Sequence, residues 1–306
     1  MSAIWKIHPA NPQRARQLAD GAGIDPLTAQ VLLNRGVANA AQARRFLHPD
    51  LAGIDDPLDL PDMARAAARI RKAIAAQEST LIFGDSDVDG LTSSVILYEA
   101  LTALGARVQA VQSNRIADGY GLPEAFIKKV CRSSTRLVIL TDCGTNQPEA
   151  VAVFAEHGID TIIVDHHVPL DAWAQPHALV NPHRGQGIGR ELCSAGLAWM
   201  AARALCGDHD AASSALDLAA LGTLADCAPL LGSNRAIVSA GLERIIDSRR
   251  PGLRRLCEAT RTLQPNPEHM IRRLIPRLNA SGRLGDVSAV WHLLHSDDAG
   301  ALDEWM

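Results

Sequence analysis

The sequence predicts an α/β fold in which a parallel sheet carries helices on both faces. Strand-like and helix-like segments alternate from about residue 79 to residue 224, which is typical of a sheet whose parallel strands are joined by helical crossovers. Three of the strand-like segments are nearly continuous apolar runs, as expected for strands that helices cover on both sides.

The individual elements follow from local pattern. Strands are expected where short apolar runs are bounded by turn residues. They are 79–83, 107–112, 136–141, 160–165 and 178–181. Helices are expected at 91–104, 123–131, 147–157, 194–206 and 214–224. An alanine- and arginine-rich segment from Met63 to Gln77 predicts one more helix ahead of the first strand, because both residue types favour helix.

Three parts are expected along the chain. Residues 1–60 form a helical, loop-rich N-terminal segment, and the run Asp55–Pro61 is typical of a connector. Residues 61–285 form the α/β domain. Residues 286–306 form a helical C-terminal connector, the start of a connecting helix.

The bulk composition excludes several classes of protein. With 306 residues, 47% of them hydrophobic, the chain is long enough for one or two domains with a large core. No apolar run reaches the roughly 20 residues of a membrane helix, and the N-terminus lacks a secretory pattern. The six cysteines are scattered without a CxxC pair, which predicts a reduced, cytoplasmic protein and argues against zinc held by thiolates.

One segment departs from the acidic balance of the chain, whose formal net charge is −4. Residues 249–283 contain nine arginines, no lysine and two glutamates. A local arginine field is typical of phosphate recognition. A solvated helix face accounts for the same pattern, and the sequence leaves both interpretations open.

Acidic residues follow three of the expected strands. Asp85, Asp87 and Asp89 follow the first strand, Asp142 follows the third, and Asp165 with His166 and His167 follows the fourth. In parallel α/β sheets, ligands bind at the carboxyl ends of the strands, so these groups are expected at one edge.

Clustered carboxylates repel one another unless a cation lies between them, so the pattern predicts bound metal. Oxygen ligands with an imidazole suit Mn²⁺ or Mg²⁺. There are enough carboxylates for two ions with a shared ligand, which together can activate water against a phosphoester. Asp226, at the end of an apolar helix, is either a further ligand or a helix-end polar residue.

Other motif interpretations fit less well. The run from Asp85 to Gly90 matches the start of an EF-hand loop, but Ile96 stands where that loop needs a glutamate. A haloacid-dehalogenase-type phosphatase requires Thr or Val two residues after its Asp-x-Asp, where Asp89 or Leu91 stands here. No Walker A loop or complete GxGxxG follows a strand.

Together the motifs resemble the DHH phosphoesterase superfamily and, within it, the single-strand-specific DNA exonucleases of the RecJ type. The resemblance covers residues 80–283, with its motifs in the family's order. They are Gly84–Thr92, Asn114–Arg115, Gly119–Leu122, Thr141–Gly144, Val164–His167, Val180–Pro182, Ser194–Ala198, Ala220–Asp226, Asn234–Arg235 and Asn279–Arg283.

The resemblance implies a role for each site residue. Asp89, Asp142, His166 and Asp226 would hold one metal ion; Asp87 and Asp142 would hold the other, with Asp142 bridging and Asp85 in or beside the coordination sphere. Asp165 would orient the site, and His167 would contact the scissile phosphate. Arg115, Asn279 and Arg283 would bind substrate phosphates. The implied activity is 5′-3′ hydrolysis of single-stranded DNA by two-metal activation of water, in a cytoplasmic protein with possible DNA repair partners.

The sequence departs from the family in two places. Ser86 stands where the family usually has tyrosine, and no Gly-Gly-His motif of the C-terminal DHHA1 domain occurs before Met306. The chain is therefore expected to be a truncated or short relative. Two alternatives stay open: a phosphatase or phosphodiesterase of a small substrate such as an oligonucleotide, cyclic dinucleotide or pyrophosphate, and a non-catalytic nucleic-acid-binding scaffold.

Overall fold

The computed structural model describes residues 8–119, 121–185, 187–207, 212, 214–284 and 287–296, without the side chains of residues 117, 118, 283 and 284. The chain divides into two compact units, Met1–Gly53 and Ile54–Met306. The boundaries expected near residues 60 and 285 stay predictions. In the described part of the chain, every helix is too short or too polar to cross a membrane.

The first unit is a small group of helices. They are α1 (Pro12–Ala22), α2 (Pro26–Asn34), α3 (Ala40–Leu47) and the 3-10 turn η1 (Leu51–Gly53). Asn11, Asp25 and Asn39 precede the three α-helices and accept hydrogen bonds from backbone N–H groups of the first turn, which satisfies donors that have no partner inside a helix. Small apolar residues such as Ala29 and Ala43 are fully buried between these helices, so this unit has its own core.

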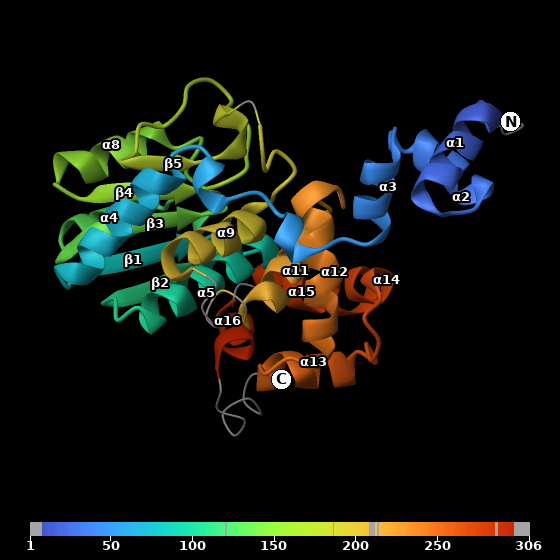
Figure 1. The fold of residues 1–306 in the computed structure, drawn as a ribbon. Coiled ribbons are helices and arrows are strands. Elements are labelled where there is room, and N and C mark those ends of the chain that lie inside the picture. Colours follow the sequence, from blue (N-terminus) through green and yellow to red (C-terminus); the bar gives the residue numbers. More distant parts are fainter. Residues whose placement is uncertain are drawn as a thin grey trace, which may run out of the picture. The chain divides into compact units, whose positions relative to one another are not determined.

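The second unit contains the predicted parallel sheet. Its strands are β1 (Ser79–Gly84), β2 (Val108–Gln112), β3 (Thr135–Thr141), β4 (Asp160–Val164) and β5 (Ala178–Val180). Their order is β2-β1-β3-β4-β5, and each neighbouring pair is parallel (Figure 1). The predicted fold class is confirmed, and the strand ends differ from the expected ones by one residue.

Helices follow the strands and continue to the end of the described chain. All six predicted helices are present, with ends shifted by up to three residues; they are α4, α5, α7, α8, α9 and α11 in the ranges that follow. The helices and helical turns of this unit are η2 (Pro57–Asp59), α4 (Met63–Ala75), α5 (Val88–Ala103), α6 (Arg115–Asp118), α7 (Glu124–Cys131), α8 (Pro148–Glu156), η3 (Pro182–Arg184), α9 (Ser194–Cys206), α11 (Leu216–Ala225), α12 (Gly232–Ile246), α13 (Pro251–Ala259), α14 (Pro267–His269), the π-helical turn η4 (Met270–Leu274), α15 (Ile275–Leu284) and α16 (Ser288–His295). Of the expected C-terminal connector, α16 lies in the described part, whereas 297–306 lies outside the described residues.

Both faces of the sheet are buried, which explains the apolar strands. Phe83, Leu140 and Ile163 are aligned across β1, β3 and β4 and pack with Phe154 of α8 on one face. The preceding residue of each strand points to the other face, because successive side chains alternate, and there the sheet contacts α5 and α9 (Figure 1). The helices α5 and α9 therefore cover this second face of the sheet.

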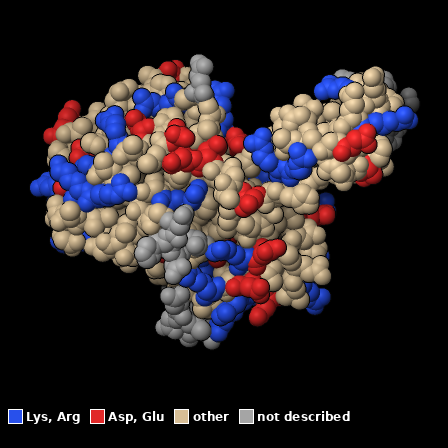
Figure 2. Space-filling model, in the orientation of Figure 1, with Lys and Arg blue, Asp and Glu red and all other residues tan. Residues whose placement is uncertain are grey.

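The arginine-rich segment does not form a uniform surface. Most of its arginines are exposed, and Arg272 pairs with Glu268 at 3.2 Å, so basic and acidic side chains are mixed on the face shown (Figure 2). Arg250 is buried instead, with 4% of its surface exposed. Its guanidinium contacts Glu99, Asp217 at 3.1 Å and the carbonyl of Leu294 at 2.8 Å, so it joins α5, α11 and α16.

Replacing Arg250 with alanine should lower the free energy of unfolding by about 3–5 kcal/mol, because the carboxylates of Glu99 and Asp217 would lose their buried counter-charge. The neighbouring Arg249 is exposed, so Arg249→Ala should change stability by less than about 0.5 kcal/mol. Urea unfolding of the two variants measures the difference. Equal stabilities would contradict a structural role for Arg250.

Candidate functional site

The strand order brings the acidic residues to one edge of the sheet. The chain leaves β1 toward β2 on one side and later enters β3 on the other, so β1 and β3 form the point where the strand order reverses. Crevices at such points are the usual ligand sites of parallel sheets. Asp85 follows β1, Asp142 follows β3 and Asp165 follows β4, and all three lie at the carboxyl edge, as the sequence predicts.

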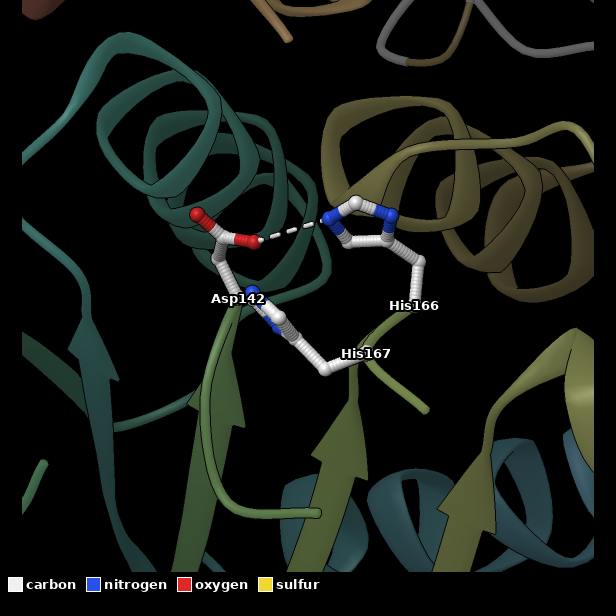
Figure 3. Close-up of side chains that lie close together, drawn as sticks. All are labelled: Asp142, His166 and His167. Carbon is white, nitrogen blue, oxygen red and sulfur yellow. Dashed lines mark ion pairs between the residues drawn. The ribbon is translucent and has the colours of Figure 1, made fainter. Parts of the chain in front are cut away.

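Three overlapping groups of side chains have the spacing of metal ligands. In each group, the potential ligand atoms lie within 4.8 Å of one another. The groups are Asp142, His166 and His167; Asp89, His166 and Asp226; and Asp85, Asp87 and Asp142. Asp142 and His166 each belong to two groups, so the predicted ligand set forms one continuous site. Figure 3 shows Asp142 and His166 pointing toward one another across the ends of β3 and β4.

His166 links the separate elements of this site. Its Nε2 atom lies 3.5 Å from Oδ1 of Asp142 and 3.8 Å from Oδ2 of Asp89, and its Nδ1 atom lies 3.9 Å from Oδ2 of Asp226. Asp89 lies in the first turn of α5, and Asp226 follows the last residue of α11. These distances are longer than most hydrogen bonds and leave room for an ion among the three carboxylates. Asp226, whose role as a metal ligand was implied by the family resemblance and not by its local sequence, faces this centre.

Asp89 is held by the first residues of α9. Its Oδ2 accepts a hydrogen bond from the N–H of Ser194, and its Oδ1 accepts one from the N–H of Ala195, both at 2.8 Å. A helix N-terminus stabilises a carboxylate through its free N–H groups and its dipole. Burial nevertheless raises the pKa of Asp89 to about 6, because desolvation disfavours the charged form.

Asp142 combines burial with an unusual backbone conformation. It is 4% exposed, and its backbone has a φ of 60°, a left-handed conformation that aspartate adopts more readily than most residues. Burial, followed by the charges of Asp89 and Asp87, raises its pKa well above the ordinary value. Carboxylates crowded in this way ionise together only when a cation compensates them, and a set of oxygen ligands with imidazole fits Mn²⁺ or Mg²⁺.

Asp85 and Asp87 share a different counter-charge. Arg115 forms ion pairs with both carboxylates, at 3.2 Å to Asp87, and the hydroxyl of Ser113 donates to Asp85 at 2.8 Å. Although burial opposes the shift, hydrogen bonds from Arg115 and Ser113 lower the pKa of Asp85. Arg115 was predicted to bind a substrate phosphate; here its guanidinium lies against two predicted metal ligands.

Asp165 and His167 form a hydrogen-bonded pair beside the ligand groups. Nδ1 of His167 donates to Oδ1 of Asp165 at 2.7 Å, and Oδ2 of Asp165 accepts from the N–H of Thr145 at 3.1 Å. The hydrogen bond raises the pKa of His167 to about 9. Despite burial, the same bond lowers the pKa of Asp165 to about 2. The ring of His167 is therefore cationic at neutral pH, oriented by a buried carboxylate, and half exposed.

The remaining predicted residues lie on α15. Asn279 accepts a hydrogen bond at Oδ1 from the N–H of Val88, the first residue of α5, at 3.1 Å. It therefore contacts the loop that carries Asp85 and Asp87, beside the site rather than inside the ligand groups. The side chain of Arg283 lies outside the described residues.

Sequence reasoning gave no role to three residues that hold these carboxylates. They are Ser113, Ser194 and Ala195, which donate to Asp85 or Asp89. Ser194 and Ala195 lie within a motif that carried the resemblance, but a serine at the start of a helix is ordinary in any sequence. Their function depends on where α9 begins relative to α5, and no local pattern reports that position.

A family model described as the N-terminal domain of the DHH family matches residues 79–223, which span β1 to α11 and nearly all of the site. Residues 79–223 therefore match an N-terminal domain of the DHH family. Among curated relatives, a single-stranded-DNA-specific exonuclease RecJ of Bacillus subtilis is 36% identical over 304 residues, which is 98% of this chain and 38% of the relative. The described ligand residues thus lie within a DHH-family domain or directly after it.

Solved structures agree with this assignment. The crystal structure of RecJ in complex with Mn²⁺ from Thermus thermophilus matches with a TM-score of 0.83 and 30% identity, over 95% of this chain and 42% of that one. A crystal structure of RecJ with Mg²⁺ from the same organism matches with a TM-score of 0.72 and 28% identity, over 95% and 39% of the two chains. The chain thus spans about two fifths of the length of these relatives.

Glycine at position 222 allows α11 to approach Asp89. A Cβ atom there would lie 2.4 Å from Cβ of Ala195, 2.5 Å from the Thr92 hydroxyl and 2.9 Å from Oδ1 of Asp89. Gly222→Ala should therefore destabilise the domain by about 1–3 kcal/mol through overpacking and should also weaken Mn²⁺ binding. Gly53, with nothing near its Cβ position, is the control.

Thermal unfolding and calorimetric Mn²⁺ titration of Gly222→Ala and Gly53→Ala measure both effects. If the Gly222→Ala protein were as stable as the Gly53→Ala protein, the close contact of α5, α9 and α11 at Asp89 would be contradicted.

Proposed function

We propose that this domain binds two divalent cations, Mn²⁺ or Mg²⁺, and hydrolyses phosphodiester bonds of single-stranded DNA from the 5′ end. The observation that carries the proposal is the sharing of Asp142 between two groups of ligand atoms. A carboxylate shared in this way is the arrangement that two neighbouring ions require. The relatives named as exonucleases, and the related structures in complex with Mn²⁺ and Mg²⁺, support the same function.

The ligand groups divide between the two ions. Asp89, His166 and Asp226 would hold one ion, Asp85 and Asp87 would contact the other, and Asp142 would contact both. When bound, such ions lower the pKa of water and neutralise the charge that develops on a phosphate. Arg115 forms ion pairs with Asp85 and Asp87, and we propose that it also binds a phosphate of the substrate.

His167 would act on the scissile phosphate. The hydrogen bond to Asp165 raises the pKa of His167 to about 9, which favours a protonated ring, and Nδ1 is occupied by that bond. Nε2 is therefore the donor left for a phosphate oxygen, where it would stabilise charge that grows in the transition state. Asp165 would be a positioning residue, since it acts through His167.

Two residues of α15 complete the proposed substrate site. Asn279 lies against the first turn of α5, which places its amide nitrogen near the loop after β1, and Arg283 lies one helical turn further along. We propose that both contact phosphates beside the cleaved bond. A cytoplasmic location and DNA repair partners remain predictions.

Asp142→Asn tests the shared ligand. Asparagine tolerates the left-handed backbone at this position but removes the charge. Loss of an outer residue of a metal site costs about 10- to 100-fold in activity, so loss of a ligand shared by two ions should lower Mn²⁺-dependent digestion of a 5′-labelled single strand by more than about 100-fold. Asp59→Asn, at an exposed acid of η2, should leave digestion unchanged. Equal activity of the two variants would rule out the proposed site.

A series of substrate lengths tests the substrate class. Strands from two to several tens of nucleotides, labelled at the 5′ end, should be digested faster as length increases, with release of labelled mononucleotide. Rates that are independent of length or fall with length would point to a small phosphodiester substrate instead. Absence of Mn²⁺ binding at millimolar metal, measured by calorimetry, would favour a non-catalytic scaffold.

A further inference from the structure

Ser194 contacts carboxylates from two different ligand groups. Its backbone N–H donates to Oδ2 of Asp89 at 2.8 Å, and its hydroxyl donates to Oδ1 of Asp142 at 3.0 Å. Ser194 is fully buried, and the two carboxylates are 3% and 4% exposed. One residue at the start of α9 thus joins the acid of α5 to the acid that follows β3.

We propose that Ser194 is a positioning residue that fixes the orientation of Asp142 as a ligand shared by two ions. This inference rests on the proposed function. A hydroxyl has one proton to donate, and here it goes to Asp142. The oxygen of Asp142 that accepts this bond, Oδ1, lies 3.5 Å from Nε2 of His166. Figure 3 shows the other oxygen of Asp142 turned away from His166. The bond from Ser194 therefore holds one oxygen toward the His166 group and leaves the other for a different partner.

The backbone of Ser194 is held in place, which fixes the position of its hydroxyl. The N–H groups of Ser194 and Ala195 both bind Asp89, and α9 is packed against α5 and α11. Because the backbone of Ser194 is held in place, its hydroxyl would lose the hydrogen bond if the carboxylate of Asp142 rotated. Outer contacts of this kind orient ligands and typically change metal affinity by about 10- to 100-fold when they are removed.

The chain offers a matched control for the chemistry of this contact. The hydroxyl of Ser248, which is 2% exposed, donates to Oδ2 of buried Asp217 at 2.9 Å. Asp217 is absent from the ligand groups found among the described residues. Ser194→Ala and Ser248→Ala therefore each remove a hydrogen bond from a serine hydroxyl to a buried aspartate, one beside the proposed metal site and one beside Arg250. The Ser248 variant also removes the acceptor of the Arg250 N–H.

Calorimetric titration with Mn²⁺ alone, on the whole chain, separates the two roles. The wild-type chain should bind two ions. Ser194→Ala should weaken at least one binding phase by about 10-fold or more, Ser194→Thr should restore it because the hydroxyl is kept, and Ser194→Cys, a weaker donor of similar size, should lie between them. Ser248→Ala should lower the melting temperature without changing either phase.

Digestion kinetics give the second measurement. With saturating DNA, Ser194→Ala should reduce kcat at low Mn²⁺, with partial recovery at high Mn²⁺ and little change in KM. Wild-type Mn²⁺ affinity in Ser194→Ala, or an effect confined to the melting temperature as in Ser248→Ala, would overturn the role of Ser194 while leaving the proposed function standing. A wild-type chain that binds no Mn²⁺ would overturn both.

Discussion

Repulsion among buried carboxylates is the constraint on which the site depends. Asp89 and Asp142 are nearly inaccessible to water, and Asp85, Asp87, Asp165 and Asp226 lie around them. Charges of one sign at such spacing are strongly unfavourable in a medium of low dielectric constant. The protein offsets this cost separately for several of these acids, and the way it does so explains the arrangement of the surrounding elements.

Each counter-charge comes from a different part of the fold. The N-terminus of α9 faces Asp89, Arg115 of α6 faces Asp85 and Asp87, and the ring of His167 faces Asp165. Asp142 accepts a hydrogen bond from the hydroxyl of Ser194, and its Oδ1 atom lies 3.5 Å from Nε2 of His166. Burial and the charges of Asp89 and Asp87 raise the pKa of Asp142 well above its ordinary value. A cation bound at Asp142 would relieve this repulsion.

The helices and the loop after β1 approach one another closely at this edge of the sheet. α5 is buried over most of its length because it lies between the sheet and the helices α9 and α11. Glycines make this possible: a Cβ atom at Gly90 would meet the backbone carbonyl of Asp85 at 2.4 Å. The glycine after Asp-x-Asp-x-Asp therefore lets the first turn of α5 fold back onto the loop that follows β1. Stability and ligand geometry are thus set by the same contacts.

The sequence by itself determined the fold class, the five strands and the edge on which the acids lie, because apolar runs and strand-helix alternation are local patterns with few topological solutions. It also predicted the side chains that the structure brings together as three ligand groups. It did not distinguish Arg250 from the exposed arginines around it, and the local pattern alone did not decide the role of Asp226, which only the family resemblance implied. Nor could it assign the contacts of Ser113 and Ser194. Those properties depend on which distant elements become neighbours, and hydrogen bonds across 28 to 105 residues of chain exist only once the tertiary structure has formed.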